Sequence, residues 1–196
     1  MKSPLFVFVF AMLLSITSSF ADDSPPSIPA SQLKAAKQAK EFFERGHYRE
    51  AERIYETMLT AAPDNLYVLS NLGVVRFRAG KLKLATDALR RAIAVAPEDD
   101  FSYCTLGIVY YTQGSYDEAV NALTKALAVN RKNATAHHYL GIVAAQKGWS
   151  EAAKQELETA TKLDPSLKTE PNVGDFLTPL EKSRLQHPSL TQEIGK

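Results

Sequence analysis

The sequence predicts an all-α protein in which four helix hairpins stack into a solenoid. A pattern of small and apolar residues repeats every 34 residues, four times and without an insertion, from residue 32 to residue 167. Each repeat carries two apolar stripes at helical spacing, separated by a glycine, and proline closes three of the four repeats. A hairpin of this kind cannot bury its apolar stripe alone, so we expect the hairpins to stack.

The first 21 residues, MKSPLFVFVFAMLLSITSSFA, have the pattern of a secretory signal peptide. Lys2 precedes an apolar run from Pro4 to Ile16, and Ser19 and Ala21 stand at the −3 and −1 positions of a cleavage site. The run is shorter than the roughly 20 residues that cross a membrane as a helix. We therefore expect cleavage after Ala21 and export to the periplasm or the medium. The alternative is an uncleaved membrane anchor.

Residues 22–31 follow as a spacer rich in proline and serine, for which we expect an extended, flexible chain. Four units come next, at residues 32–65, 66–99, 100–133 and 134–167.

Small residues and glycine explain how each unit folds. Position 8 of the units is Ala39, Gly73, Gly107 and Gly141, and position 20 is alanine in all four. Small side chains at these two positions let the helices of one hairpin approach closely. Position 15 is always glycine (Gly46, Gly80, Gly114 and Gly148), which ends the first helix in a left-handed conformation. Position 32 is Pro63, Pro97, Arg131 and Pro165, and the prolines end the second helix.

These residues resemble the tetratricopeptide repeat (TPR) family, which has the same period and the same small and aromatic residues. The resemblance covers residues 32–167 and implies a right-handed superhelix whose first helices line a concave groove. Three positions depart from the family pattern: Met58 replaces a small residue, Arg76 an aromatic residue and Arg131 a proline. We expect looser packing in unit one and at the third turn.

The first helices should present positions 2, 5, 6, 9, 12 and 13 to the groove, opposite the stripe that packs on the second helix. We call this surface the inner wall. In units two and three it is rich in aromatic and apolar residues, which anchor peptides and partner helices. An alternative for positions 9 and 12 is packing between neighbouring repeats. The predicted groove residues are Tyr67, Asn71, Val74, Phe77, Arg78, Phe101, Thr105, Ile108, Tyr111 and His138.

Some TPR proteins hold a C-terminal carboxylate with lysine, asparagine and arginine in the first three units. The corresponding residues here are Leu33, Lys37, Asn71, Phe101 and Thr105, so only Asn71 matches. The sequence therefore predicts an apolar and aromatic groove.

Charge is uneven along the chain, although the net charge of +1 gives no general attraction to nucleic acid. Between residues 66 and 97, Asp87 is the only acid. An acidic partner segment is one interpretation of this excess, and an anionic lipid surface is another. A solvated face balanced by acids elsewhere is the third. The basic residues are Arg76, Arg78, Lys81, Lys83, Arg90 and Arg91.

The sequence offers little for catalysis, and we expect no enzyme, metal or cofactor. Cys104 is the only cysteine, which rules out an intramolecular disulfide and a multi-cysteine metal site. His137 and His138 are adjacent, so on a helix they point about 100° apart and chelate poorly. The remote alternative is an accessory enzyme subunit that uses Cys104 and His138, which share position 5 in neighbouring units. Asn133, Ala134 and Thr135 form a glycosylation sequon, which has meaning in a eukaryotic source.

The array ends with unit four, where Lys154 and Thr161 replace the apolar residues Val120 and Leu127 of unit three. A terminal helix needs such a polar outer face. In the tail, residues 168–196, Thr178–Glu181 is a capping-box start that predicts a short helix near residues 179–186. Phe176, Leu177 and Leu180 would dock this helix on the last repeat; a loosely attached tail is the alternative.

The leading hypothesis is a non-enzymatic, exported scaffold that binds a peptide or partner helix in the groove. The alternative is a membrane-tethered adaptor that resembles bacterial kinesin-light-chain-like repeat proteins and binds a filament. Pairing of two arrays into a homo-oligomer is compatible with either hypothesis.

Overall fold

The computed structural model describes residues 30–169 of the 196-residue chain. The predicted signal peptide, most of the predicted spacer and the predicted tail helix lie outside these residues. Helix α2 begins at Ala30, so the last two residues assigned to the spacer are helical.

Within residues 30–169 the protein consists of eight α-helices in four antiparallel hairpins, followed by a short 3₁₀ helix. The all-α solenoid predicted from the sequence is therefore confirmed. The hairpins are α2 (Ala30–Glu44) with α3 (Tyr48–Ala61), α4 (Leu66–Arg78) with α5 (Leu82–Val95), α6 (Asp100–Gln113) with α7 (Tyr116–Val129), and α8 (Ala134–Gln146) with α9 (Ser150–Leu163). The 3₁₀ helix η2 covers Pro165–Thr169.

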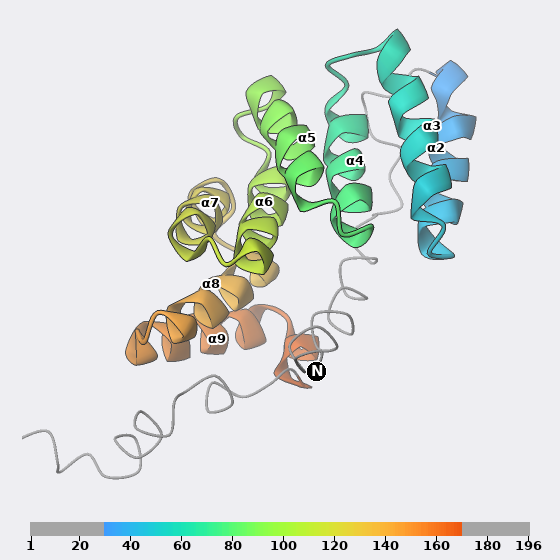
Figure 1. Ribbon diagram of the computed structural model, residues 1–196. Coiled ribbons are helices and arrows are strands. Elements are labelled where there is room, and N and C mark those ends of the chain that lie inside the picture. Colours follow the sequence, from blue (N-terminus) through green and yellow to red (C-terminus); the bar gives the residue numbers. More distant parts are fainter. Residues whose placement is uncertain (1–29, 170–196) are drawn as a thin grey trace, which may run out of the picture.

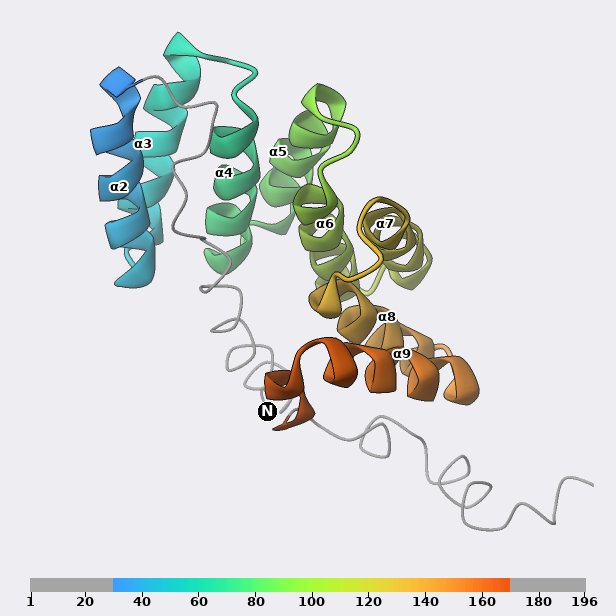
Figure 2. The same ribbon diagram turned by 180° about the vertical axis from the view of Figure 1, so that it is seen from behind.

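The four hairpins follow one another along a curved array, with α2–α3 at one end and α8–α9 at the other (Figure 1). The view from behind shows the same order (Figure 2). Each second helix packs on the first helix of the next hairpin, and α6 also packs directly against α4 and α8. The second helices of neighbouring hairpins approach one another less closely. The first helices therefore lie on the inner side of the curve, as the TPR resemblance implied.

The turn inside each hairpin depends on its glycine. Gly114 has a φ of 78°, a left-handed conformation that is strained for residues with a Cβ. Its N–H donates to Tyr111 O at 3.0 Å, and the Ser115 N–H donates to Tyr110 O at 2.9 Å, so the last carbonyls of α6 are satisfied. The equivalent glycines of the other hairpins have φ values of 75–77°. The glycine at position 15 thus ends each first helix in the predicted way.

Close contact within each hairpin depends on the small residue at position 8. A Cβ placed on Gly107 of α6 would lie 2.6 Å from Cγ of Leu123 in α7 and 3.3 Å from the Leu123 backbone nitrogen. Real Cβ atoms do not come this close to neighbours, so even alanine would push the helices apart. Gly73 and Gly141 meet Leu89 and Leu157 in the same way.

The last residue of each of the first three units caps the helix that follows, a role that the sequence analysis did not assign. Asn65, Asp99 and Asn133 each accept a hydrogen bond from the backbone N–H three residues later, at 3.2, 3.0 and 2.9 Å. A side-chain oxygen of this kind satisfies one of the free N–H groups at a helix start. The caps therefore set where α4, α6 and α8 begin.

The positions that depart from the family pattern are well packed, which corrects the expectation of looser packing. Met58 is 4% exposed and belongs to a core cluster with Ala51, Tyr55 and Val68. At the third turn, where Arg131 replaces proline, Asn130 and Asn133 both donate to Asp100 Oδ2, at 2.9 and 2.8 Å. Hydrogen bonds between the start of unit three and its end thus hold this turn in the absence of the proline.

Arg76 does not loosen the array either, because it replaces an aromatic contact by ionic ones. Its Nε lies 3.0 Å from Glu52 Oε1 and one terminal nitrogen lies 2.8 Å from Glu56 Oε1. Lys81 Nζ lies 2.5 Å from the other oxygen of Glu52. We call Glu52, Glu56, Arg76 and Lys81 the ionic joint, since they connect the first hairpin to the second.

Candidate functional site

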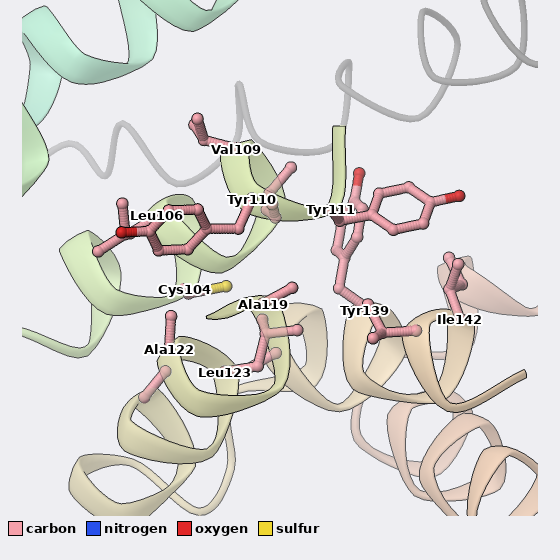
Figure 3. Close-up of a cluster of buried hydrophobic side chains, with 14 of the residues drawn as sticks. Cys104, Leu106, Val109, Tyr110, Tyr111, Ala119, Ala122, Leu123, Tyr139 and Ile142 are labelled. Atoms are coloured by element: carbon pink, nitrogen blue, oxygen red, sulfur yellow. The ribbon is translucent and has the colours of Figure 1, made fainter. Parts of the chain in front are cut away.

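The candidate site is the inner wall formed by α4, α6 and α8. Its packed layer belongs to a core cluster that runs from Phe77 of α4 through α6 to Ile142 of α8. Figure 3 shows part of this cluster, with Tyr111 of α6 beside Tyr139 and Ile142 of α8. The ring centroids of Tyr111 and Tyr139 are 6.0 Å apart at 64°, an edge-to-face contact. This aromatic pair therefore joins the neighbouring first helices α6 and α8 in the wall.

Three of the predicted groove residues are half-buried: Tyr67, Arg78 and Phe101. We call them the contact residues. Tyr67 and Phe101 occupy the same repeat position on α4 and α6. Both pack against the core cluster that contains Tyr55, Met58 and Val68. The Tyr67 ring meets Tyr55 edge-on, with centroids 6.5 Å apart. Each aromatic ring is thus anchored on one side and partly exposed on the other.

Arg78 is held over aromatic rings of the first hairpin. Its guanidinium carbon lies 5.7 Å from the centroid of Phe43 and 5.9 Å from that of Tyr48. A terminal nitrogen donates to the Tyr48 hydroxyl at 3.3 Å. These contacts place a positive charge on the inner wall between the first and second hairpins. Phe43 occupies position 12 of unit one, a position that the sequence assigned to the inner wall, whereas Tyr48 was missed because it belongs to a second helix.

The other predicted groove residues are buried. Val74 is 2% exposed and Ile108 is 1% exposed, so position 9 contributes to packing between repeats, the alternative that the sequence left open. The remaining five are Asn71, Phe77, Thr105, Tyr111 and His138. A partner in the groove therefore meets the contact residues first, and the buried residues support them from behind.

Two buried polar side chains of the wall donate their hydrogen bonds to backbone carbonyls of their own helices. Asn71 Nδ2 donates to the Tyr67 carbonyl at 2.7 Å, and Thr105 Oγ1 donates to the Phe101 carbonyl at 2.8 Å. Both bonds reach back four residues, a common way to satisfy a polar side chain inside a helix. Asn71 is the one residue that matches the carboxylate-binding set, and its side-chain amide donates to the backbone of its own helix.

Burial shifts the pKa values of Cys104 and His138 in directions that keep both groups neutral. Burial, with a smaller effect of the Asp100 charge, raises the pKa of the Cys104 thiol to about 12. Burial lowers the pKa of His138 to about 4, and its Nε2 has no hydrogen-bond partner. A cysteine nucleophile requires a thiolate, which a neighbouring imidazolium stabilises. The arrangement argues against the remote alternative of a Cys104–His138 catalytic pair.

Most of the basic residues of unit two bind other groups of the protein. Arg76 and Lys81 belong to the ionic joint. Arg90 donates to the Tyr110 hydroxyl at 2.8 Å, and Arg91 donates to the Pro63 carbonyl at 2.8 Å. Acids of the first hairpin thus balance part of the positive charge. Of the three interpretations of this excess, the structure favours a charge balanced elsewhere in the fold.

The remaining candidates from the sequence have structural roles. His137 Nδ1 lies 2.6 Å from Glu156 Oε2 and Nε2 lies 3.0 Å from the Arg131 carbonyl, so both ring nitrogens are occupied. Asn133 of the sequon caps α8 and donates to Asp100. Residues 30–169 contain no cluster of three or more histidine, cysteine, aspartate or glutamate side chains suited to a metal ion. Over the same residues, no helix has both the length and the apolar character needed to cross a membrane.

The fold and the inner wall define the class of protein: an α-solenoid whose first helices form a concave, partly aromatic surface. The chain belongs to the tetratricopeptide repeat family. Models described as tetratricopeptide repeat match residues 36–100 and 134–167, and one described as TPR repeat matches residues 109–148. No curated protein matches the sequence.

Solved structures share the fold at low sequence identity. TTC0263, a thermophilic TPR protein of Thermus thermophilus, superposes with a TM-score of 0.66 at 22% identity, over 79% of this chain and 84% of that chain. MamA gives a TM-score of 0.63 at 21% identity, over 80% and 85% of the two chains. The first TPR of Spaghetti (RPAP3), bound to the HSP90 peptide SRMEEVD, gives 0.58 at 20% identity, over 63% and 98%. These similarities establish the fold.

Proposed function

We propose that this protein is a non-enzymatic scaffold that binds a peptide or a helix of another protein along its inner wall. The observation that carries the proposal is the set of contact residues. Tyr67 and Phe101 lie at the same repeat position on neighbouring first helices, and both are half-buried on a packed support. Anchored aromatic side chains contribute large contact areas at a low cost in conformational entropy, as do the hot spots of protein interfaces.

The chemistry of the wall favours a mainly apolar segment that carries an acidic group. The aromatic contact residues would bind apolar side chains, and Arg78, which lies near the rings of both Phe43 and Tyr48, would attract a carboxylate. Spaghetti (RPAP3) holds an HSP90 peptide in its solved complex. The present chain has Leu33, Phe101 and Thr105 where carboxylate-binding members have charged or amide side chains. We therefore propose a different peptide class from the acidic tails that such members bind.

We further infer that the protein works outside the cytoplasm, after cleavage of residues 1–21. The inference rests on the signal pattern in the sequence, with its apolar run from Pro4 to Ile16 and the small residues Ser19 and Ala21 before the cut. Expression in a secretion-competent host, followed by fractionation and intact-mass measurement, tests this step. Loss of residues 1–21 from a soluble fraction supports export. An intact N-terminus in the membrane fraction supports the tethered adaptor.

The binding surface is tested by a double substitution. Tyr67→Ala with Phe101→Ala removes both aromatic anchors, and we expect affinity for a co-purified partner to fall by about 30-fold or more, in line with hot-spot truncations of about 2 kcal/mol. Trp149→Ala is the matched control, because Trp149 is an aromatic residue 47% exposed at the α8–α9 turn, outside the inner wall. Unchanged binding by the double variant, or an equal loss in the control, would contradict the proposal. Circular dichroism checks that both variants fold.

A further inference from the structure

We propose that the outer face of α5 is a second docking surface, which binds an acidic amphipathic helix of another protein. α5 is the second helix of its hairpin, so it lies on the outer side of the curve, away from the inner wall (Figure 1). The inference therefore does not depend on the proposed function. We call the exposed residues of this helix the outer face; they are Lys83, Leu84, Asp87, Arg90, Arg91, Ala94 and Val95.

The outer face exposes more large apolar side chains than the other second helices do. Leu84 is 44% exposed and Val95 is 41% exposed, whereas in the described part of the chain α7 and α9 each expose one such residue and α3 exposes none. The two residues are separated by about three helical turns, so they lie on the same side of α5, and Arg91 lies between them on that side. An apolar line of this kind is a surface on which a second helix can pack.

The basic side chains of the outer face keep a charge that no salt bridge neutralises. The ionic joint accounts for two of the six basic residues of unit two. Within residues 30–169, Lys83, Arg90 and Arg91 form no salt bridge, and Asp87 is the one acid on α5. On α3, α7 and α9, exposed acids equal or outnumber exposed bases. Balance within the fold therefore explains the ionic joint, but it leaves the outer face of α5 positive.

The two arginines are held in place by neutral acceptors on either side of α5. A terminal nitrogen of Arg90 donates to the hydroxyl of Tyr110 in α6, and one of Arg91 donates to the carbonyl of Pro63, before α4. Since neither acceptor carries a charge, both guanidinium groups remain positive and have further N–H donors for a carboxylate. A side chain that is already ordered also loses less conformational entropy when a partner binds.

These properties specify the chemistry of the partner. Its carboxylates would pair with Arg90 and Arg91, and its apolar side chains would cover Leu84 and Val95. A helix fits this surface because its backbone groups bond to one another, whereas an extended segment would lay unpaired N–H and C=O groups against side chains. The apolar line measures about 16 Å, at roughly 1.5 Å per residue, so a partner helix of about three turns would cover it.

The test measures binding of a synthetic amphipathic helix to the full chain by fluorescence anisotropy. The probe has leucines at heptad a and d positions with glutamates beside them, and a second peptide has lysines in place of the glutamates. We expect Arg90→Gln with Arg91→Gln to weaken binding of the glutamate peptide by about tenfold, and Arg90→Lys with Arg91→Lys to retain most of it. Lys125→Gln with Lys132→Gln, at exposed sites of unit three, is the matched control with the same change in charge.

The apolar part of the surface is tested with the same probe. Leu84→Ala with Val95→Ala should also weaken binding, whereas Val129→Ala with Leu163→Ala, at comparably exposed residues of α7 and α9, should not. An equal loss in either control pair would overturn the proposal, because the attraction would then be general. So would the absence of binding by the glutamate peptide, or equal binding by the lysine peptide. Circular dichroism verifies that all variants are folded.

Two further measurements separate this surface from other sites. The Tyr67→Ala and Phe101→Ala variant should bind the glutamate peptide as the native protein does, whatever the outcome for the proposed function. Loss of peptide binding in that variant, with none in the variant that lacks both arginines, would place the peptide on the inner wall and refute the inference. Vesicles that contain phosphatidylglycerol are the second probe. If they bind through Arg90 and Arg91 while the peptide does not, the ligand is a lipid surface and the proposal is wrong.

Discussion

At the scale of single residues, His138 is the least expected feature of the inner wall. It is a titratable side chain, 3% exposed, whose Nε2 has no hydrogen-bond partner. Its ring packs edge-on against Tyr139, with centroids 5.7 Å apart. A buried imidazole of this kind resists protonation, since the charged form would lose its hydration. His138 should therefore make the stability of the array depend on pH.

We predict that the stability of the protein falls as the pH drops from 6.5 to about 4, and that His138→Phe removes most of this dependence. In the folded state the pKa of His138 lies near 4, below its ordinary value of 6.5, so the folded protein binds fewer protons in this window than the unfolded chain. The effect is roughly 3 kcal/mol at most. Urea unfolding at several pH values measures it.

The exposed His47 supplies the control for this prediction, because His47→Gln should leave the pH dependence between 6.5 and 4 in place. If His138→Phe keeps the full slope, another group is responsible. At neutral pH the same variant should be at least as stable as the native protein, since it removes an unpaired buried polar atom.

At the scale of elements, the ionic joint decides how the first hairpin meets the second. Burial raises the pKa of Glu52, but hydrogen bonds from Lys81 and Arg76, and their charges, outweigh it, so the pKa lies below the ordinary 4.5. The joint stands where the family pattern has an aromatic contact. Geometry between these two hairpins is therefore set by directional ionic contacts as well as by apolar packing.

We predict that Glu52→Gln destabilises the joint by about 2 kcal/mol, because Arg76, 15% exposed, would lose its buried acidic partner and keep only Glu56, which is 51% exposed. Hydrogen exchange should rise in α2 and α3 and stay unchanged in α8 and α9. Since Glu52 has a lowered pKa, its contribution is present above pH 4.5 and is lost as the pH falls through the folded-state pKa. The native protein should thus lose this protection in acid, and the variant should not.

The pair of substitutions Glu52→Leu and Arg76→Leu is the informative comparison. Replacing both partners of a buried ion pair by apolar residues is often close to neutral. If the double variant is as unstable as Glu52→Gln, the loss arises from packing and not from an unpaired charge.

At the scale of the whole molecule, stability should be distributed along the array. In residues 30–169 the main contacts of each hairpin are with its neighbours, and repeat proteins built in this way behave as chains of coupled units. The last unit is closed by η2, whose Leu167 is 7% exposed and joins the large core cluster. Leu167 therefore covers one end of the described array.

We predict that Leu167→Ala loosens the last hairpin without unfolding the first. Truncation of a buried leucine costs about 2–5 kcal/mol, and at an array end this loss should appear as local opening. Hydrogen exchange should therefore rise in α8 and α9 and remain unchanged in α2 and α3. An equal rise in every helix would instead show that the array unfolds as one unit. Leu163→Ala, at a 39% exposed leucine nearby, is the control.

The fold was predictable because its causes are local and repeated. Glycine at position 15 ends each first helix and Gly107 brings α6 against α7, and both requirements are visible in residue types alone. The helix caps at Asn65, Asp99 and Asn133 were also visible, as an amide or acid before each first helix, but the sequence analysis gave them no role. Asn133 was interpreted only as part of the sequon, so its cap was missed.

The site was predictable only in part. The sequence analysis named ten groove residues, and three of them, Tyr67, Arg78 and Phe101, are half-buried. Val74 and Ile108 lie within packing layers instead. The ionic partners of Arg76 lie 24 and 20 residues away in sequence, so a pattern taken one unit at a time could not reveal them.

By itself, the sequence determined the class of fold, the number of hairpins between residues 32 and 167 and which helices form the wall. It could do so because the glycine and alanine positions and the spacing of apolar residues take effect inside a single hairpin. Tertiary structure decided which wall residues face outward, where the basic side chains find partners and why Cys104 and His138 stay neutral. These properties depend on the distance and curvature between hairpins, which arise only when side chains of different units pack against one another.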